Sequence, residues 1–366
     1  MKKIIHTGRA LAAALAGAAL LLGGVASLAQ SRAEYDALRV ANMHLRSEVD
    51  SLRRELNRLR GTMAFSKWDE LTGMEEDGVS SGLFVAVGGM NEQGRSFSGP
   101  TDSQFMTEIR LAMPCVTLPY NRLLDKYIDT YSISRRKSMP YIMGRYNAWL
   151  PVFREAFRRH GVPEELTALC IVESAVSPKA LSPAGAMGVW QFMPETARRY
   201  GLRVDQWVDE RMDITKATDA AARYLMNSYN MFGRWDLAVD AYNCGPGGIR
   251  RALVNSRNAT DFWRLNEFLP QETQGYFPAL VGVRYVLLFG EAMGIIPAQY
   301  ARPALTLVTP GRQVTLKNAS EATGIPLKTL QELNPHILKG VVPPDAGFYV
   351  PTDKLGIVRT WLDAAK

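Results

Sequence analysis

Hydrophobic and polar residues alternate with helical spacing through most of the chain, from about residue 102 to residue 294, and strand-like alternation is rare there. The pattern predicts a mainly α-helical domain at residues 102–300. A small β-α-α-β unit is predicted at residues 301–353, with strands at 305–308 and 347–350 and helices at 314–323 and 326–333. Residues 354–366 are predicted to form a C-terminal tail with a terminal helix, to which no role is given.

The N-terminus begins with basic residues and continues with an uncharged apolar stretch. Lys2, Lys3 and Arg9 precede residues 10–29, which are almost entirely Ala, Leu, Gly and Val. Small residues end the stretch where a signal peptidase would cut, and twenty residues can just span a bilayer. We therefore predict that residues 1–29 are a signal peptide or a membrane anchor. A buried Ala-rich helix is the alternative interpretation.

Residues 30–60 carry a heptad repeat. Leucines recur every seventh residue, at Leu38, Leu45, Leu52 and Leu59. Asn42 occupies the other core position, where a polar residue favours two parallel strands. This pattern predicts a coiled coil that forms a homodimer, with a lone solvated helix as the alternative. Residues 61–101 are rich in Gly, Ser and acidic residues without periodicity, which predicts a flexible linker.

Composition excludes several functional classes. The 366 residues carry a net charge of +7, of which residues 1–60 contribute +5, from ten basic and five acidic residues. The remainder is nearly neutral, so we expect no nucleic-acid partner. The three cysteines and four histidines are isolated in the sequence, which argues against a disulfide scaffold and a zinc site. No metal ion or other cofactor is predicted.

Glu173 lies on the apolar face of a predicted helix that begins near Pro163. It follows Leu166, Leu169 and Cys170 at spacings that bring all four residues to one face. Burial raises the pKa of a carboxyl group, so that it can donate a proton near neutral pH. Spacing alone leaves two interpretations open, a catalytic acid and a glutamate satisfied by local donors.

Three later segments combine glycines with aromatic and amide side chains. They are residues 182–194, 241–247 and 272–278. Trp190, Tyr242 and Tyr276 offer apolar faces with polar edges, while Gln191 and Asn243 offer hydrogen-bond donors and acceptors. This mixture suits a sugar chain, which has CH faces and hydroxyl rims.

Together with the Glu173-Ser174 pair, these ordered motifs resemble the lytic murein transglycosylases of glycoside hydrolase family 23, which have a goose-lysozyme-like fold. The resemblance covers about residues 120–285. It implies a mainly α, lysozyme-like catalytic domain that acts on peptidoglycan glycan strands. An enzyme with this substrate is expected to be exported to the periplasm, and membrane-anchored if its N-terminal segment is not cleaved.

The resemblance also implies residue roles. Glu173 matches the single catalytic acid of the family, and Trp190 stands where many members have methionine, which could reshape one sugar subsite. The implied substrate-binding residues are Ser174, Ser182, Gln191, Met193, Tyr242, Asn243 and Tyr276. Of these, Ser182 matches a serine near the reacting centre and Tyr276 a tyrosine beside the acid.

The implied reaction cleaves the bond between N-acetylmuramic acid and N-acetylglucosamine without water. One carboxyl group acts first as acid and then as base, and a 1,6-anhydro ring closes on the muramic acid. Asp205, Asp213 and Asp240 are possible second carboxylates, or otherwise caps and surface charges. Two alternatives remain: a lysozyme-type hydrolase, and a non-catalytic dimeric scaffold that binds the cell wall.

The unit at residues 301–353 resembles a LysM domain, a small module that binds N-acetylglucosamine chains. The usual Gly-Asp-Thr-Leu start of that domain is absent, and residues 310–313 stand in its place. Glycan binding and a purely structural role are both open for this module. Cys170 and Cys244 are either a redox-sensitive pair near the site or two small buried residues.

Overall fold

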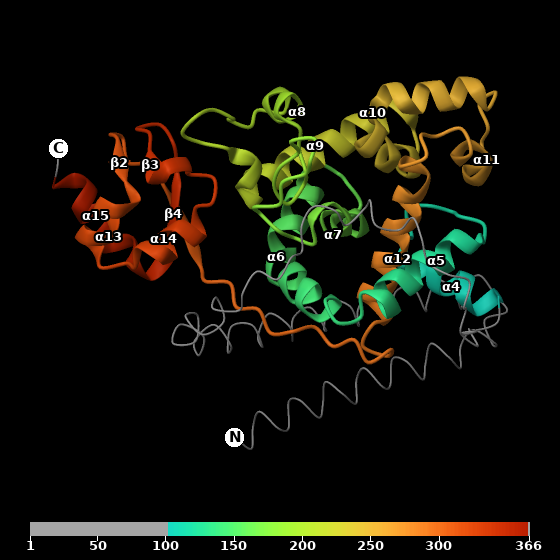
Figure 1. Ribbon diagram of the computed structural model, residues 1–366, viewed down its shortest axis with the longest axis horizontal. Coiled ribbons are helices and arrows are strands. Elements are labelled where there is room, and N and C mark those ends of the chain that lie inside the picture. Colours follow the sequence, from blue (N-terminus) through green and yellow to red (C-terminus); the bar gives the residue numbers. More distant parts are fainter. Residues whose placement is uncertain (1–101, 365–366) are drawn as a thin grey trace, which may run out of the picture. The chain divides into compact units, whose positions relative to one another are not determined.

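The computed structural model of the chain describes residues 102–364 (Figure 1). The predicted N-terminal apolar segment, coiled coil and linker lie outside these residues. Within the described part of the chain, no helix is both long enough and apolar enough to cross a membrane.

Residues 102–289 form a helical domain, as the spacing of apolar residues predicts. Amphipathic segments begin mostly at polar or proline residues, and side chains of Asn121, Asp213 and Asp261 cap the helices that follow them. The α-helices are α4 (Asp102–Ala112), α5 (Arg122–Asp129), α6 (Met139–Arg159), α7 (Leu169–Ser174), α8 (Pro194–Arg199), α9 (Ile214–Phe232), α10 (Trp235–Asn255), α11 (Phe262–Asn266) and α12 (Tyr276–Phe289). Short π- and 3₁₀-helical turns, η2 (Thr130–Ser134), η3 (Glu164–Ala168), η4 (Glu210–Met212) and η5 (Thr273–Gly275), connect them.

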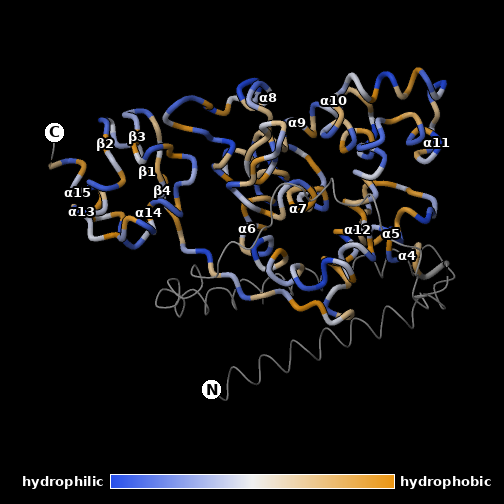
Figure 2. Tube along the Cα trace, in the orientation of Figure 1, coloured by the Kyte–Doolittle hydropathy of each residue, from blue (hydrophilic) through white to orange (hydrophobic). Residues whose placement is uncertain are grey.

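The short helix α7 lies at the centre of this domain, with α6, α9 and α12 around it (Figure 1). Cys170, Ile171 and Val172 are fully or almost fully buried in the main hydrophobic core. Most residues of α12 are also buried, whereas hydrophobic and hydrophilic residues alternate along the other helices (Figure 2). A buried, centrally placed α7 gives Glu173 a rigid base.

Helix α10 is kinked, and the kink follows the Tyr242-Asn243-Cys244 segment. Gly245 has a φ of 72°, which a residue with a side chain rarely adopts, and Pro246 follows it. Beyond the kink, Ile249 and Ala252 pack against Leu265 and Leu269 in a second hydrophobic cluster. The kink therefore ends the first half of α10 at the residues predicted to line the site.

The C-terminal module has the two predicted strands and the two predicted helices, and also two short strands that the sequence pattern did not predict. Strand β1 (Leu305–Val308) pairs antiparallel with β4 (Phe348–Pro351), and β2 (Val314–Thr315) pairs with β3 (Val341–Val342). Helices α13 (Leu316–Thr323) and α14 (Leu327–Leu333) lie between them in sequence, and the 3₁₀ turns η6 (Leu338–Gly340) and η7 (Thr352–Lys354) complete the unit. The terminal helix α15 (Leu355–Asp363) belongs to the module, because Val358 and Leu362 lie in its core.

Candidate active site

Glu173 is the next-to-last residue of α7. The 3₁₀ turn η3 directly precedes α7, so the predicted helix is not one continuous α-helix. Leu166, Leu169 and Cys170 are fully buried, as predicted. Glu173 is only partly buried, so its carboxyl group lies at the edge of the core. The helix ends one residue later, so this acid lies at a helix end.

The backbone directly after Glu173-Ser174 is strained. Ala175 has a φ of 52° and Val176 a φ of 63°, and both residues are buried. A β-branched residue such as Val176 pays a steric penalty in this left-handed region, so surrounding packing must hold it there. Such strain is typical of functional sites.

Tyr276, the first residue of α12, donates a hydrogen bond from its hydroxyl group to Glu173 Oε1. Burial raises the pKa of Glu173 to about 7, while the Tyr276 hydrogen bond lowers this pKa and the negative charge of Glu272 raises it. A carboxyl group with a pKa near 7 can both give and take a proton at neutral pH.

The loop at residues 181–192 runs beside α7 and carries Ser182 and Gln191. Met187 forms isolated antiparallel bridges with both Leu181 and Phe192. Ser182 Oγ accepts a hydrogen bond from the Ala186 backbone N–H at 2.9 Å, which closes the tight turn between them. The loop therefore has a defined shape without belonging to a regular sheet.

Gln191 and Ser174 tie this loop to the core. The Gln191 side-chain amide donates to the carbonyl groups of Ala180 at 3.0 Å and Gly188 at 2.8 Å. The Ser174 hydroxyl donates to the carbonyl of Val189 at 2.9 Å. Ser174 is buried and Gln191 is half-buried, so these contacts support the loop, and their predicted substrate contacts stay predictions.

Tyr242 and Asn243 approach the same region from α10. The Tyr242 hydroxyl donates to the carbonyl of Trp190 at 2.8 Å, and its ring packs edge-on against Phe192. Asn243 Oδ1 accepts a hydrogen bond from the buried Thr273 hydroxyl at 2.7 Å. Three separate segments of the chain thus converge on the end of α7: the 181–192 loop, the middle of α10 and the start of α12.

Trp190 is a core residue, so the expectation that its face contacts sugar is wrong. Its side chain is 0% exposed, stacks on Phe157 and donates from Nε1 to the Thr218 hydroxyl at 2.9 Å. The ring of Tyr276 is 1% exposed and is likewise unavailable for stacking. Sequence patterns do not distinguish a buried aromatic in a glycine-rich turn from an exposed one. Met193, by contrast, is 43% exposed just beyond the loop.

The three aspartates considered as second carboxylates have separate environments. Asp213 is the N-cap of α9, and Asp205 accepts backbone N–H groups within a turn and pairs with Arg203. Asp240 is neither a cap nor a surface charge, because it is fully buried in α10. The carboxylate whose charge raises the pKa of Glu173 is Glu272, which the sequence indicates only as part of the segment at residues 272–278.

The cysteines near the site are thiols. Burial raises the pKa of Cys170 well above its usual value and that of Cys244 to about 11. Cys170 is fully buried, while Cys244 is partly buried and lies against the Asp240 carbonyl. Raised pKa values suppress thiolate formation, which favours packing over reactivity for both residues.

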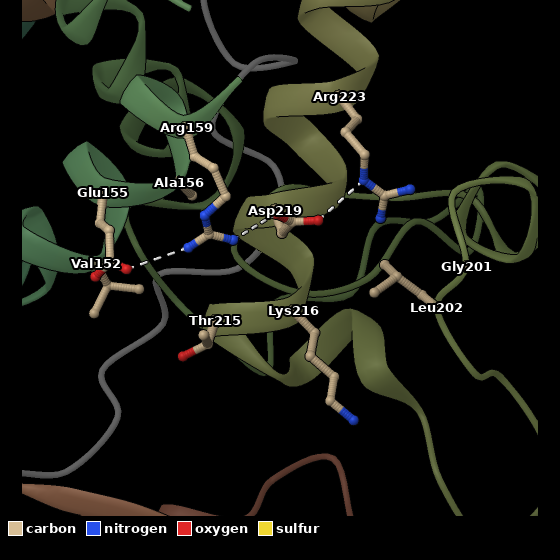
Figure 3. Close-up of a pocket in the computed structure, with 10 residues that line it drawn as sticks. All are labelled: Val152, Glu155, Ala156, Arg159, Gly201, Leu202, Thr215, Lys216, Asp219 and Arg223. Carbon is tan, nitrogen blue, oxygen red and sulfur yellow. Dashed lines mark hydrogen bonds and ion pairs between the residues drawn. The ribbon is translucent and has the colours of Figure 1, made fainter. Parts of the chain in front are cut away.

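A cavity of about 380 Å³ lies between α6 and α9, apart from these residues (Figure 3). Asp219 sits within it between Arg159 and Arg223 and pairs with both. None of the predicted site residues lines this cavity. Residues 102–364 contain no cluster of side chains suited to hold a metal ion.

Comparison with known families matches two parts of the chain. Residues 151–264 match the Transglycosylase SLT domain, which contains every predicted site residue except Tyr276. Residues 304–366 match the LysM-like domain of lytic transglycosylase MltD. The chain therefore combines an SLT domain, which contains α7, with a LysM-like domain of this type. The second match includes α15, which agrees with its place in the core of the module.

The chain is also similar to individual curated proteins. Membrane-bound lytic murein transglycosylase D of Escherichia coli (strain K12) is 33% identical over 202 residues, which are 54% of this chain and 44% of that protein. Soluble lytic murein transglycosylase of the same strain is 31% identical over 135 residues, or 34% of this chain and 21% of that one. The chain thus spans less than half the length of these relatives.

Among solved structures, the 70-kDa soluble lytic transglycosylase of Escherichia coli is 29% identical. The match covers 39% of this chain and 25% of that one, with a TM-score of 0.33.

Proposed function

We propose that this protein is a peptidoglycan lytic transglycosylase with Glu173 as its single catalytic acid and base. The observation that carries this proposal is the partly buried Glu173 carboxyl group, held by Tyr276 and given a pKa near 7. The SLT domain and the names of the similar proteins indicate the substrate. The proposed substrate bond joins C1 of N-acetylmuramic acid to O4 of N-acetylglucosamine.

In the first step, protonated Glu173 gives its proton to the glycosidic oxygen, and the C1–O4 bond breaks. The cationic muramic acid is stabilised by its own acetamido group, so no second carboxylate is required. In the second step, the C6 hydroxyl of the same sugar attacks C1 and its proton passes to the Glu173 carboxylate. The products are a free N-acetylglucosamine end and a 1,6-anhydromuramic acid end, and the enzyme returns to its starting state.

The surrounding residues have proposed roles in binding this substrate. Ser182, Gln191 and Met193 would line the glycan groove from the loop, and Tyr242 and Asn243 would form its floor. Ser174 would act through its contact with Val189, which holds the loop against α7. Peptidoglycan lies outside the cytoplasmic membrane, so this function requires export, to which the apolar stretch at residues 10–29 is suited.

A lysozyme-type hydrolase is the second candidate, because one further acid influences the site. Glu272 is exposed and its charge raises the pKa of Glu173. A hydrolase would use such a carboxylate to position water, and its product would be a reducing muramic acid end.

Mass spectrometry of the products from purified murein tests the proposal. The full chain should release anhydro-terminated fragments, one water lighter than lysozyme products, and Glu173→Gln should release none. Glu195→Gln, which alters an exposed glutamate on α8, serves as the matched control and should behave like the wild type. Hydrated ends would instead establish the hydrolase. Murein binding by the wild type without either product would indicate a scaffold.

A further inference from the structure

The segment from Arg203 to Asp213, which connects α8 to α9, has a fixed shape. Val204 and Asp209 form an antiparallel bridge, and the Glu210 backbone N–H donates to the Arg203 carbonyl at 2.8 Å. Asp205 Oδ1 accepts from the backbone N–H groups of Trp207 at 2.7 Å and Val208 at 2.9 Å. The segment is therefore a tight hairpin, and a displacement of one of its ends moves the other end as well.

One end of this hairpin holds the 181–192 loop through Arg211. The Arg211 guanidinium donates from Nη1 to the carbonyl of Gly185 at 2.8 Å and to that of Phe192 at 3.1 Å. These two carbonyls belong to the two sides of the loop that carries Ser182 and Gln191. The Arg211 backbone carbonyl also lies against Gly188, so closely that a Cβ there would be 1.8 Å away.

Asp209 fixes the orientation of that guanidinium. It accepts from Arg211 Nε at 2.9 Å and from Nη2 at 2.7 Å, and both side chains are only 8% exposed. Burial removes the hydration of both charged groups, and this cost offsets much of their attraction. The Asp209–Arg211 pair is therefore weak evidence that these residues serve only to stabilise the fold. Its planar, forked geometry instead leaves Nη1 aimed at the two loop carbonyls.

The tip of the same hairpin is built into the LysM-like module. Val208 is buried in the core of the module and forms a bridge with Ile337. Asp209 N–H donates to the His336 carbonyl at 2.9 Å, and Leu338 N–H donates to the Trp207 carbonyl at 2.8 Å. The module therefore holds Asp209, the residue that orients Arg211.

At the base of the hairpin, the module makes a further contact with the helical domain. The Tyr349 hydroxyl lies 3.0 and 3.1 Å from the two carboxyl oxygens of Asp213, the N-cap of α9. The module is thus hydrogen-bonded both to the tip of the hairpin and to its base.

We propose that Arg211 is a positioning residue for the proposed transglycosylase reaction and that the LysM-like module holds it in place. This inference rests on the proposed function for its catalytic consequence. The module supports the hairpin, the hairpin orients Arg211, and Arg211 holds the loop that carries Ser182 and Gln191 beside Glu173. In this arrangement the module contributes to turnover even where it binds no glycan.

Hydrogen exchange in the full chain, without substrate, tests the positioning itself. The reporters are the amides of Met187 and Phe192, which bond to each other's carbonyls across the loop. Arg211→Lys keeps the charge but loses the fork, and we expect these amides to exchange at least about tenfold faster. Trp207→Ala leaves Arg211 in place but removes a side chain that packs against the core of the module and lies under Lys339, and we expect a smaller acceleration. Arg199→Lys, the same change at an exposed arginine of α8 outside the hairpin, is the matched control.

Kinetics with murein test the catalytic consequence. Arg211→Lys should lower kcat/KM by about 10- to 100-fold, because a displaced substrate loop loses orientation, while the alkaline limb of the pH profile stays in place. Unchanged exchange in a folded Arg211→Lys variant would overturn the proposal, and unchanged exchange in Trp207→Ala would overturn the part played by the module. If the wild type forms no anhydro product, the proposed function fails, whereas the exchange result still decides whether Arg211 positions the loop.

Discussion

The Tyr276 hydroxyl donates a hydrogen bond to the Glu173 carboxyl group across 103 residues of sequence. Tyr276 begins α12 and Glu173 nearly ends α7, so this contact joins two helix ends at the edge of the core. A donor to a carboxylate favours its charged form, whereas burial favours the neutral form. The balance between them leaves the pKa of Glu173 at about 7, where the proposed acid and base roles are both accessible.

Tyr276→Phe should raise the pKa of Glu173 further. The variant loses the donor that favours the carboxylate, and burial then acts with less opposition. Since the reaction starts from the protonated acid, the alkaline limb of kcat/KM against pH should move to higher pH. Tyr285→Phe removes a tyrosine–glutamate hydrogen bond from the same helix, to Glu108, and should leave the limb unchanged. A limb that moves to lower pH in Tyr276→Phe contradicts this account.

Glu272→Gln should have the opposite effect. Removing this negative charge makes the Glu173 carboxylate easier to form, so the pKa of Glu173 falls and the alkaline limb moves to lower pH. Salt should weaken the difference between variant and wild type, because Glu272 is exposed. Glu267→Gln, at another exposed glutamate before η5, is the control. Loss of all activity in Glu272→Gln, rather than a shifted profile, would favour the hydrolase.

Glu173→Gln should abolish most activity and yet stabilise the protein at neutral and higher pH. Loss of a general acid lowers rates by about 10²- to 10⁴-fold. The folded-state pKa near 7 exceeds the usual 4.5, so the folded state binds more protons between these values and wild-type stability falls as pH rises through them. The variant avoids this loss, and its advantage in free energy of unfolding should reach at most about 3 kcal/mol above pH 7.

Denaturant unfolding of wild type and Glu173→Gln at pH 4 and pH 8 measures this effect. The two proteins should differ little at pH 4, where Glu173 is mostly protonated in both the folded and the unfolded state. An advantage for the variant that is the same at both pH values would show that ionisation of Glu173 is not its source. Glu195→Gln should show no such pH-dependent gain.

Sequence and structure agree where burial determines the pattern. The apolar spacing of Leu166, Leu169 and Cys170 predicted the buried face below Glu173, and the two strands and two helices predicted for the module are present. Local patterns could not show which aromatic residues are exposed, and Trp190 is therefore the clear error. Nor could they reveal the contacts of Arg211 and Tyr349, whose partners lie far along the chain. Contacts of this kind depend on tertiary packing, which hydrophobic periodicity does not encode.

Gly188→Ala should disrupt the 181–192 loop through a collision with Arg211. Gly188 has a φ of 86°, and a Cβ there would lie 1.8 Å from the Arg211 carbonyl oxygen. Gly185→Ala is a matched control, because its φ of 88° carries similar strain while nothing lies within 4 Å of a new Cβ. We expect Gly185→Ala to cost about 1–2 kcal/mol of stability from backbone strain. Gly188→Ala should cost at least about 1 kcal/mol more, since the backbone must also move. Equal losses in thermal unfolding would show that contact with Arg211 does not constrain the loop.

Asp240→Asn should stabilise the protein increasingly as pH rises. Burial, and next the charge of Asp236, raises the pKa of Asp240 well above its usual value. Among the described residues, neither carboxyl oxygen has a well-formed hydrogen bond, although the backbone N–H of Phe277 is close enough to favour the charged form. The folded state therefore keeps a proton that the unfolded chain releases above pH 3.8, and wild-type stability falls from that pH upward until the raised pKa is passed.

An asparagine has no proton to retain, so its advantage in melting temperature over the wild type should be larger at pH 8 than at pH 5. Asp236→Asn is not a usable control, because Asp236 pairs with Arg234. Asp353→Asn alters an exposed aspartate of the C-terminal module instead and should show no pH-dependent gain. A difference between variant and wild type that does not grow from pH 5 to pH 8 would mean that Asp240 is ionised in the folded protein over this range.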